Sequence, residues 1–87
     1  MKPLNDPKRK LEIIELAQAA LDRHQPRRYR VSVDPDGIYD DDGWTYIVVV
    51  SENDQRDRDF YDSLEEAEEE ILTEDGPQYL LVPTIPS

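Results

Sequence analysis

The sequence predicts an α+β fold, with a single three- to four-stranded, mainly antiparallel sheet and two helices in the order α-β-β-(β)-α-β. Residues 44–51 (Trp-Thr-Tyr-Ile-Val-Val-Val-Ser) form the longest run of β-branched and aromatic residues, and neither alternating set is polar. Such a strand is expected mid-sheet, with cover on both faces. Helical periodicity on either side of this strand predicts the two helices. Shorter apolar runs at 28–34 and 79–82 predict its neighbours in the sheet.

The first helix is expected to begin at Asp6-Pro7 and to end near His24. Asp6 suits the N-cap and Pro7 the first helical position, where its missing N–H would be unpaired in any case. Pro26 disfavours helical geometry in the residue before it. The expected apolar face of this helix consists of Leu11, Ile14, Ala17 and Leu21, flanked by Ile13, Leu16 and Ala20.

The two middle strands are expected to form an antiparallel hairpin. Alternation over 28–34 places Tyr29, Val31 and Val33 on one face. Residues 34–37 (Asp-Pro-Asp-Gly) have the composition of a turn. We therefore expect a long acidic connection over residues 34–43.

The second helix is expected to begin at Ser63, because Ser63 and Glu66 match a capping box, and to end at Gly76-Pro77. For Phe60-Tyr61 the sequence is compatible with two alternatives, a short third strand and an apolar plug. Tyr79 to Val82 is expected to pair with the central strand, and Pro83 to end it. The apolar stripe of the second helix is Leu64, Ala67, Ile71 and Leu72.

Eighty-seven residues indicate one domain, residues 1–87, in which we expect 1–5 and 84–87 to be flexible. The net charge of −11 is uneven, with +4 on residues 1–30 and −15 on residues 31–87. Such a surface repels nucleic acid and anionic lipid and favours a basic partner. The absence of cysteine, of an apolar N-terminal segment and of a membrane-length apolar run predicts a cytoplasmic protein.

No catalytic pattern is visible, so we expect neither an enzyme nor a cofactor. The single histidine, His24, is expected to be a surface residue or a partner of the dipole at a helix C-terminus. The serines match no nucleophile motif, and the three glycines lie in expected turns. Arg27, Arg28 and Arg30 beside Tyr29 resemble a nucleic-acid patch, but we expect them to be neutralised within the protein, for example by the glutamates of the second helix.

The acidic residues provide the candidate binding surface. Asp40, Asp41 and Asp42 lack the spacing of a calcium loop, and no metal site is expected. The candidate partner-binding residues are Glu65, Glu66, Glu69 and Glu70 of the second helix, with Asp40, Asp41 and Asp42 of the hairpin connection.

The chain resembles small, acidic, uncharacterised bacterial proteins with a domain of unknown function, through Trp44, the glutamates of 65–70 and Leu80-Leu81-Val82-Pro83. That resemblance implies no activity. A hairpin followed by Ser63-Leu64-Glu65-Glu66-Ala67 is more remotely similar to HicB-like antitoxin domains, which use the sheet to bind and block a small basic RNase. The chain departs from those domains in its N-terminal helix, in residues 52–59 and in lacking a DNA-binding tail.

Three functional hypotheses follow. The first is a non-catalytic, acidic protein-binding module, of antitoxin or inhibitor type, with a basic protein as partner. The second is a structural homodimer formed through the sheet edge or through the aromatic residues Trp44, Tyr46, Tyr61 and Tyr79. The third is a metal-assisted enzyme that uses Asp40 to Asp42.

Overall fold

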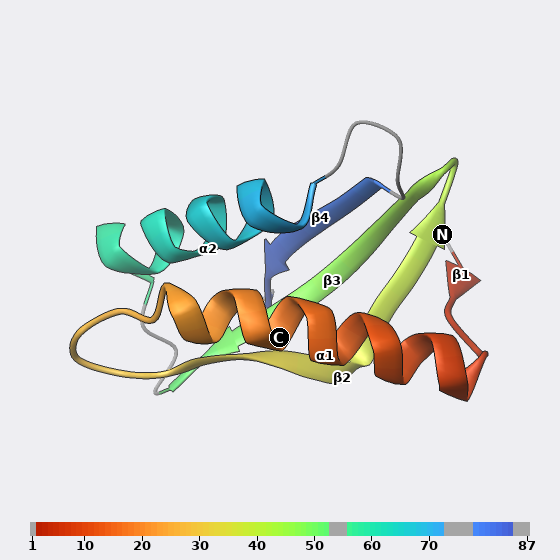
Figure 1. Ribbon diagram of the computed structural model, residues 1–87, viewed down its shortest axis with the longest axis horizontal. Helices are drawn as coiled ribbons and strands as arrows, with labels where there is room; N and C mark the ends of the chain where they lie inside the picture. The colour runs from red at the N-terminus through yellow and green to blue at the C-terminus, as the bar shows by residue number, and fades with distance from the viewer. Residues whose placement is uncertain (1, 53–55, 73–77, 85–87) are drawn as a thin grey trace.

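The computed structural model describes residues 2–52, 56–72 and 78–84, and three long strands and two helices give the α+β order α-β-β-α-β that the sequence predicts (Figure 1). A two-residue strand precedes them. The elements are β1 (Lys2–Pro3), α1 (Pro7–Arg23), β2 (Val31–Asp41), β3 (Trp44–Ser51), α2 (Arg58–Ile71) and β4 (Gln78–Pro83).

The strands lie in the order β1-β2-β3-β4, so the apolar strand β3 is inside the sheet, as expected. β1 and β3 run antiparallel to β2, whereas β4 runs parallel to β3. A parallel neighbour requires a crossover, and the segment containing α2 supplies it. The sheet is therefore mainly antiparallel, with one parallel pair.

The connection between β2 and β3 is a tight turn, so the long acidic connection was a wrong prediction. Asp41 pairs with Trp44, and the two residues between them, Asp42 and Gly43, both have positive φ, 48° and 86°. Two-residue hairpin turns of type I′ need this conformation, which Asp-Gly adopts readily. The 34–37 segment lies inside β2, where the pairing register shifts between Val33 and Ile38.

Helix α1 begins and ends where its sequence signals predict. The Asp6 carboxylate accepts the backbone N–H groups of the first turn, and His24 is the C-cap. The predicted apolar face is rotated, because Leu11 is 56% exposed and Leu16 is also exposed. The buried residues of α1 are Ile13, Ala17, Ala20 and Leu21.

Helix α2 begins five residues before the predicted N-cap. Asp57 is the N-cap and accepts the N–H of Phe60, whose side chain is 1% exposed. Ser63 is a buried residue within the helix, so its predicted capping role was wrong. Phe60-Tyr61 lies in the helix and not in a strand, with Phe60 buried in the core and Tyr61 exposed. The helix ends at Ile71, and the predicted stop at Gly76-Pro77 lies outside the described residues.

Both helices pack on the same face of the sheet, so the expectation of cover on both faces was wrong (Figure 1). α1 packs against β2 and α2 packs against β4, and the helices contact each other. Leu4, in the segment expected to be flexible, is buried and donates its N–H to Ile38 O at 2.9 Å. The sheet residues of the core are Val31, Val33, Ile38, Ile47, Val49, Tyr79 and Leu81.

Candidate interaction surface

The sheet face opposite the helices, here called the open face, carries an apolar groove of about 560 Å³. Successive strand residues alternate between faces. Those of β3 that face away from the helices are therefore Trp44, Tyr46, Val48 and Val50, of which Trp44 is exposed and the others half-buried. The groove is lined by Asp34, Gly37, Tyr39, Tyr46, Val48, Val82, Pro83 and Thr84.

The irregular segment of β2 forms one wall of this groove. Gly37 packs so closely on Val48 that a Cβ atom at Gly37 would lie 2.5 Å from the Val48 Cβ. Across the sheet, Val48 pairs in register with Val82, which brings β4 to the opposite wall. The irregular segment of β2, which was predicted to be a turn, therefore shapes the groove.

Tyr39 and Tyr46 line the groove toward one end of the strands, and Thr84 lines it toward the other. Tyr39 and Tyr46 are cross-strand partners in the β2–β3 pair, so their rings share the open face. Thr84 follows β4 and is fixed by hydrogen bonds from its N–H and its hydroxyl to Val49 O, both 3.0 Å.

Two carboxylates belong to the open face, Asp34 in the lining of the groove and Asp41 beyond the tyrosine pair, and we call them the carboxylate rim. Asp34 lines the groove, and one of its oxygens accepts the N–H of Asp36 at 2.9 Å. Asp41 is exposed beside Trp44, its cross-strand partner. Within the described residues neither rim carboxylate has an ion pair.

The structure separates the three predicted aspartates of the hairpin. Asp40 lies on the helix-covered face, where it accepts the Thr45 hydroxyl at 2.9 Å and forms an ion pair with Arg9 at 3.4 Å. Asp41 borders the open face, and Asp42 is in the turn. These three side chains do not converge on one site.

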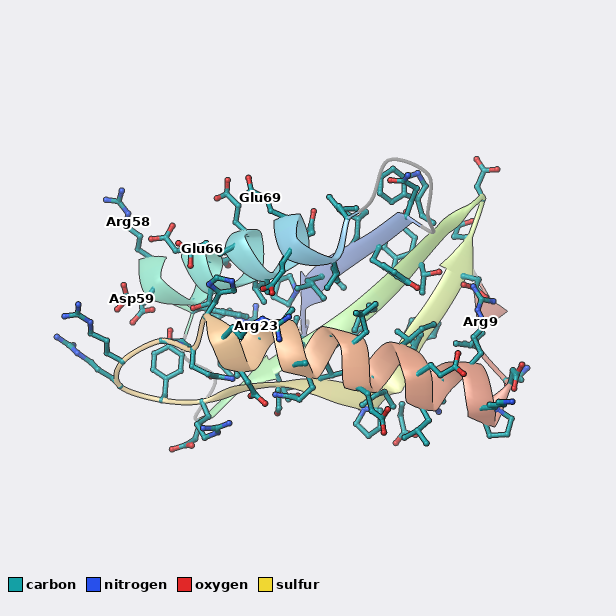
Figure 2. The ribbon with its side chains drawn as sticks, viewed as in Figure 1. Arg9, Arg23, Arg58, Asp59, Glu66 and Glu69 are labelled. Carbon is teal, nitrogen blue, oxygen red and sulfur yellow. The ribbon has the colours of Figure 1, made fainter. Side chains whose placement is uncertain are left out.

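The four predicted glutamates of α2 divide into two pairs. Glu70 forms a close ion pair with Arg23, and the His24 ring contacts Glu66 at 3.2 Å and Glu70 at 2.9 Å. These groups tie the C-terminal end of α1 to α2. In Figure 2, Glu66 and Arg23 lie between the helices, whereas Glu69 points outward. Glu65 and Glu69 are exposed, and no ion pair to either occurs within the described residues.

Arg30 is neutralised within the protein, as predicted, but its partner is Asp22 of α1 at 3.1 Å and not a glutamate of α2. Arg27 lines an open polar hollow of about 410 Å³ between the helix ends, where Arg23 and His24 face Asp59, Asp62 and Glu66. Opposite charges are mixed in this hollow, so it does not select one sign of ligand.

Tyr29 connects the start of β2 to the cap of α2. Its hydroxyl donates to the Asp57 carboxylate at 2.5 Å. This hydrogen bond lowers the pKa of Asp57, and the N–H of Phe60 acts in the same direction. Burial, reinforced by the Asp57 carboxylate, raises the pKa of Tyr29 well above its ordinary value. The hydrogen bond between Tyr29 and Asp57 therefore holds the start of β2 against the start of α2, away from the groove.

No catalytic arrangement is evident in the part of the chain that the structure describes. Among residues 2–52, 56–72 and 78–84, no three His, Cys, Asp or Glu side chains gather as metal ligands. Neither described helix is long and apolar enough to cross a membrane. The chain matches no family model, no curated protein and no solved structure in the three comparisons.

The groove was not predicted from the sequence. The predicted binding surface consisted of charged residues, whereas the groove is lined mostly by apolar residues, of which only Tyr46 was expected in an interface. The signal that could have found it was the second apolar set of β3, in a chain too short to supply helices for both faces of a sheet.

Proposed function

We propose that this protein is a non-catalytic protein-binding module that engages a basic partner protein through the open face. One observation carries the proposal: an apolar groove that no described segment covers, lined by Asp34, which has no ion pair among the described residues, lies on a chain of net charge −11. Apolar surface of this kind marks interaction sites. An acidic surrounding accelerates association with a positively charged protein. An antitoxin or inhibitor of a basic protein is the kind of role that fits.

The surface proposed here differs from the one expected from sequence. Glu66 and Glu70 are engaged with α1, and Asp40 is engaged with Arg9 and Thr45. Glu65 and Glu69 remain as an outer acidic face that adds to long-range attraction. The binding energy is assigned instead to apolar side chains, because exposed charges alone contribute little affinity.

A structural homodimer is the alternative, and charge argues against it. Two copies packed through their open faces would bring two carboxylate rims together on molecules that each carry −11. Like charges placed together at an interface are costly. The aromatic set proposed for such a dimer is also divided, since Tyr79 is buried beneath the helices while Trp44 and Tyr46 are on the open face.

The test compares two variants with the same chemical change. Val48→Lys places a charge in the groove, and Leu11→Lys places one on the exposed surface of α1. Wild-type protein and both variants are used as baits in extracts of the native cells at low and high salt, with circular dichroism to confirm folding. We expect a basic partner that is captured by wild type and Leu11→Lys, lost with Val48→Lys, and weakened by salt.

Two results would contradict the proposal. One is a partner retained equally by both variants, because the groove would then be irrelevant to binding. The other is the absence of any salt-sensitive basic partner. Light scattering on the purified protein tests the alternative, and we expect a monomer.

A further inference from the structure

Side chains of the protein itself occupy the free edge of β2. The Gln25 amide pairs with Val31 as a neighbouring strand would, accepting its N–H at 2.8 Å and donating to its carbonyl at 2.8 Å. Gln18 accepts the N–H of Val33 at 2.9 Å. β1 covers the other end of the same edge, around Tyr39 and Asp40.

At the opposite edge of the sheet, a side chain also hydrogen-bonds to the backbone of the edge strand. β4 is the last strand, and Glu68 of α2 accepts the N–H of Leu81 at 3.2 Å. Pro83 ends this strand, and proline has no N–H to offer a further strand. Exposed edges otherwise attract added strands. We call Gln18, Gln25 and Glu68 the edge guards.

Building on the proposed function, we infer that the partner docks on the open face as a basic amphipathic helix, while the edge guards prevent strand addition. A strand added at either edge would have to displace charged or amide side chains that already satisfy the backbone. A helix needs no backbone partner, since its own hydrogen bonds are internal. The open face has apolar contact area and no backbone edge to offer.

The dimensions and charges of the groove fit this occupant. Its lining comes from three adjacent strands, β2, β3 and β4, which together span about 10 Å at about 4.8 Å per strand. That width matches the diameter of a helix, about 10 Å. The open-face side chains of Tyr46 and Val48 are about 7 Å apart along β3, close to the spacing of helix neighbours at i and i+4. Lysine or arginine beside the apolar stripe would reach Asp34 and Asp41.

Two synthetic peptides of identical length and Leu/Lys composition test the inference. One has leucine at helical spacing, and the other alternates leucine and lysine as in a strand. Binding to the wild-type protein is followed by amide NMR shifts and hydrogen exchange. We expect the helical peptide to bind at least about tenfold more tightly, a difference of about 1.4 kcal/mol, and to shift the amides of Tyr46, Val48 and Val82.

Variants distinguish helix binding on the open face from strand addition at the edges of the sheet. Val48→Lys should abolish binding of the helical peptide, and Leu11→Lys should preserve it. Gln18→Ala/Gln25→Ala should allow the strand peptide to bind, with new protection of the Val31 and Val33 amides. Strand-peptide protection of Val31, Val33 or Leu81 in the wild-type protein would overturn the inference, as would helical-peptide binding that survives Val48→Lys.

Two remaining outcomes are also decisive. A wild-type dimer that buries Tyr46 and Val48 would make a second copy the occupant and would overturn the inference. Binding of neither peptide would do the same. The proposed function is tested separately by capture from cell extracts. It stands if a native basic partner is captured by wild type and lost with Val48→Lys, even when neither peptide binds. It fails if no such partner is captured, even when a peptide binds.

Discussion

Tyr29 joins the start of β2 to the first turn of α2 through one hydrogen bond. Removing the hydroxyl in Tyr29→Phe leaves the ring in the core and deprives Asp57 of its strongest partner. We expect a thermal midpoint lower by a few degrees at pH 7, because hydrogen bonds to charged groups are stronger than neutral ones. Differential scanning calorimetry of both proteins measures the change. Tyr61→Phe, on the exposed surface of α2, is the matched control and should leave the midpoint unchanged.

The hydrogen bond between Tyr29 and Asp57 also makes the loss of stability in Tyr29→Phe depend on pH. The pKa of Asp57 is lower in the folded protein than in the unfolded chain. The stabilisation that the ionised Asp57 carboxylate gives to the folded state is therefore complete above the ordinary carboxyl pKa. It is lost as the pH falls through the pKa of Asp57 in the folded protein. The stability difference between wild type and Tyr29→Phe should shrink below about pH 4. A difference that stays constant between pH 7 and pH 3 would show that the carboxylate is not the partner that matters.

Gly37 has a steric role rather than a conformational one. An added Cβ would meet Val48 at 2.5 Å, so Gly37→Ala must displace β2 or β3. We expect a loss of about 1–3 kcal/mol, typical of overpacking, measured by urea unfolding. Val48→Ala in the same chain should recover part of this loss, since it removes the atoms beyond the Val48 Cβ, one of which lies 2.9 Å from the added atom. Purely additive losses in the double variant would contradict the steric explanation.

At the scale of elements, the signals that predicted correctly were local and chemically specific. The Asp6-Pro7 start and the stop before Pro26 located α1, and the composition of β3 placed it inside the sheet. Two local signals competed at the hairpin, Asp34 to Gly37 and Asp42-Gly43. The second is the turn, because only it allows apolar β2 residues on both sides of the irregularity to pair with β3.

The start of α2 shows the same competition. Ser63 and Glu66 match a capping box, yet Asp57 is the cap because an earlier start buries Phe60 in line with Leu64, Ala67 and Ile71. Burial of an aromatic side chain outweighs a local capping preference, since it removes far more apolar surface from water. Local motifs alone could not rank these starts, because the ranking depends on what the rest of the chain packs against.

At the scale of the whole molecule, the open face follows from the amount of chain available. Two helices of this length pack side by side on one face, and no described segment covers the other. The sequence therefore revealed that β3 is apolar on both sides, but not which side the helices would choose. The candidate surface could not be derived from charge, because carboxylates are abundant and only the tertiary contacts separate paired ones from unpaired ones.

The excess negative charge gives a prediction that only the assembled molecule permits. Glu65 and Glu69 are like charges at i and i+4, as are Glu66 and Glu70, and such pairs oppose helix formation. In the second pair, the Arg23 guanidinium of α1 offsets the repulsion through its ion pair with Glu70, and the His24 ring hydrogen-bonds to Glu70 at 2.9 Å. In the first pair, no counter-charge occurs within the described residues. Neutralising the two pairs should therefore change stability in opposite directions.

Glu65→Gln/Glu69→Gln and Glu66→Gln/Glu70→Gln remove the same number of negative charges, and glutamine has nearly the helix propensity of glutamate. We expect the first variant to raise the thermal midpoint by about 2–4 °C, from about 0.5 kcal/mol of relieved repulsion. The second should lower it by up to about 8 °C, since exposed ion pairs contribute at most about 1 kcal/mol. Both changes should diminish at high salt. If both variants are stabilised equally, net charge alone governs stability and the contacts between α1 and α2 contribute nothing.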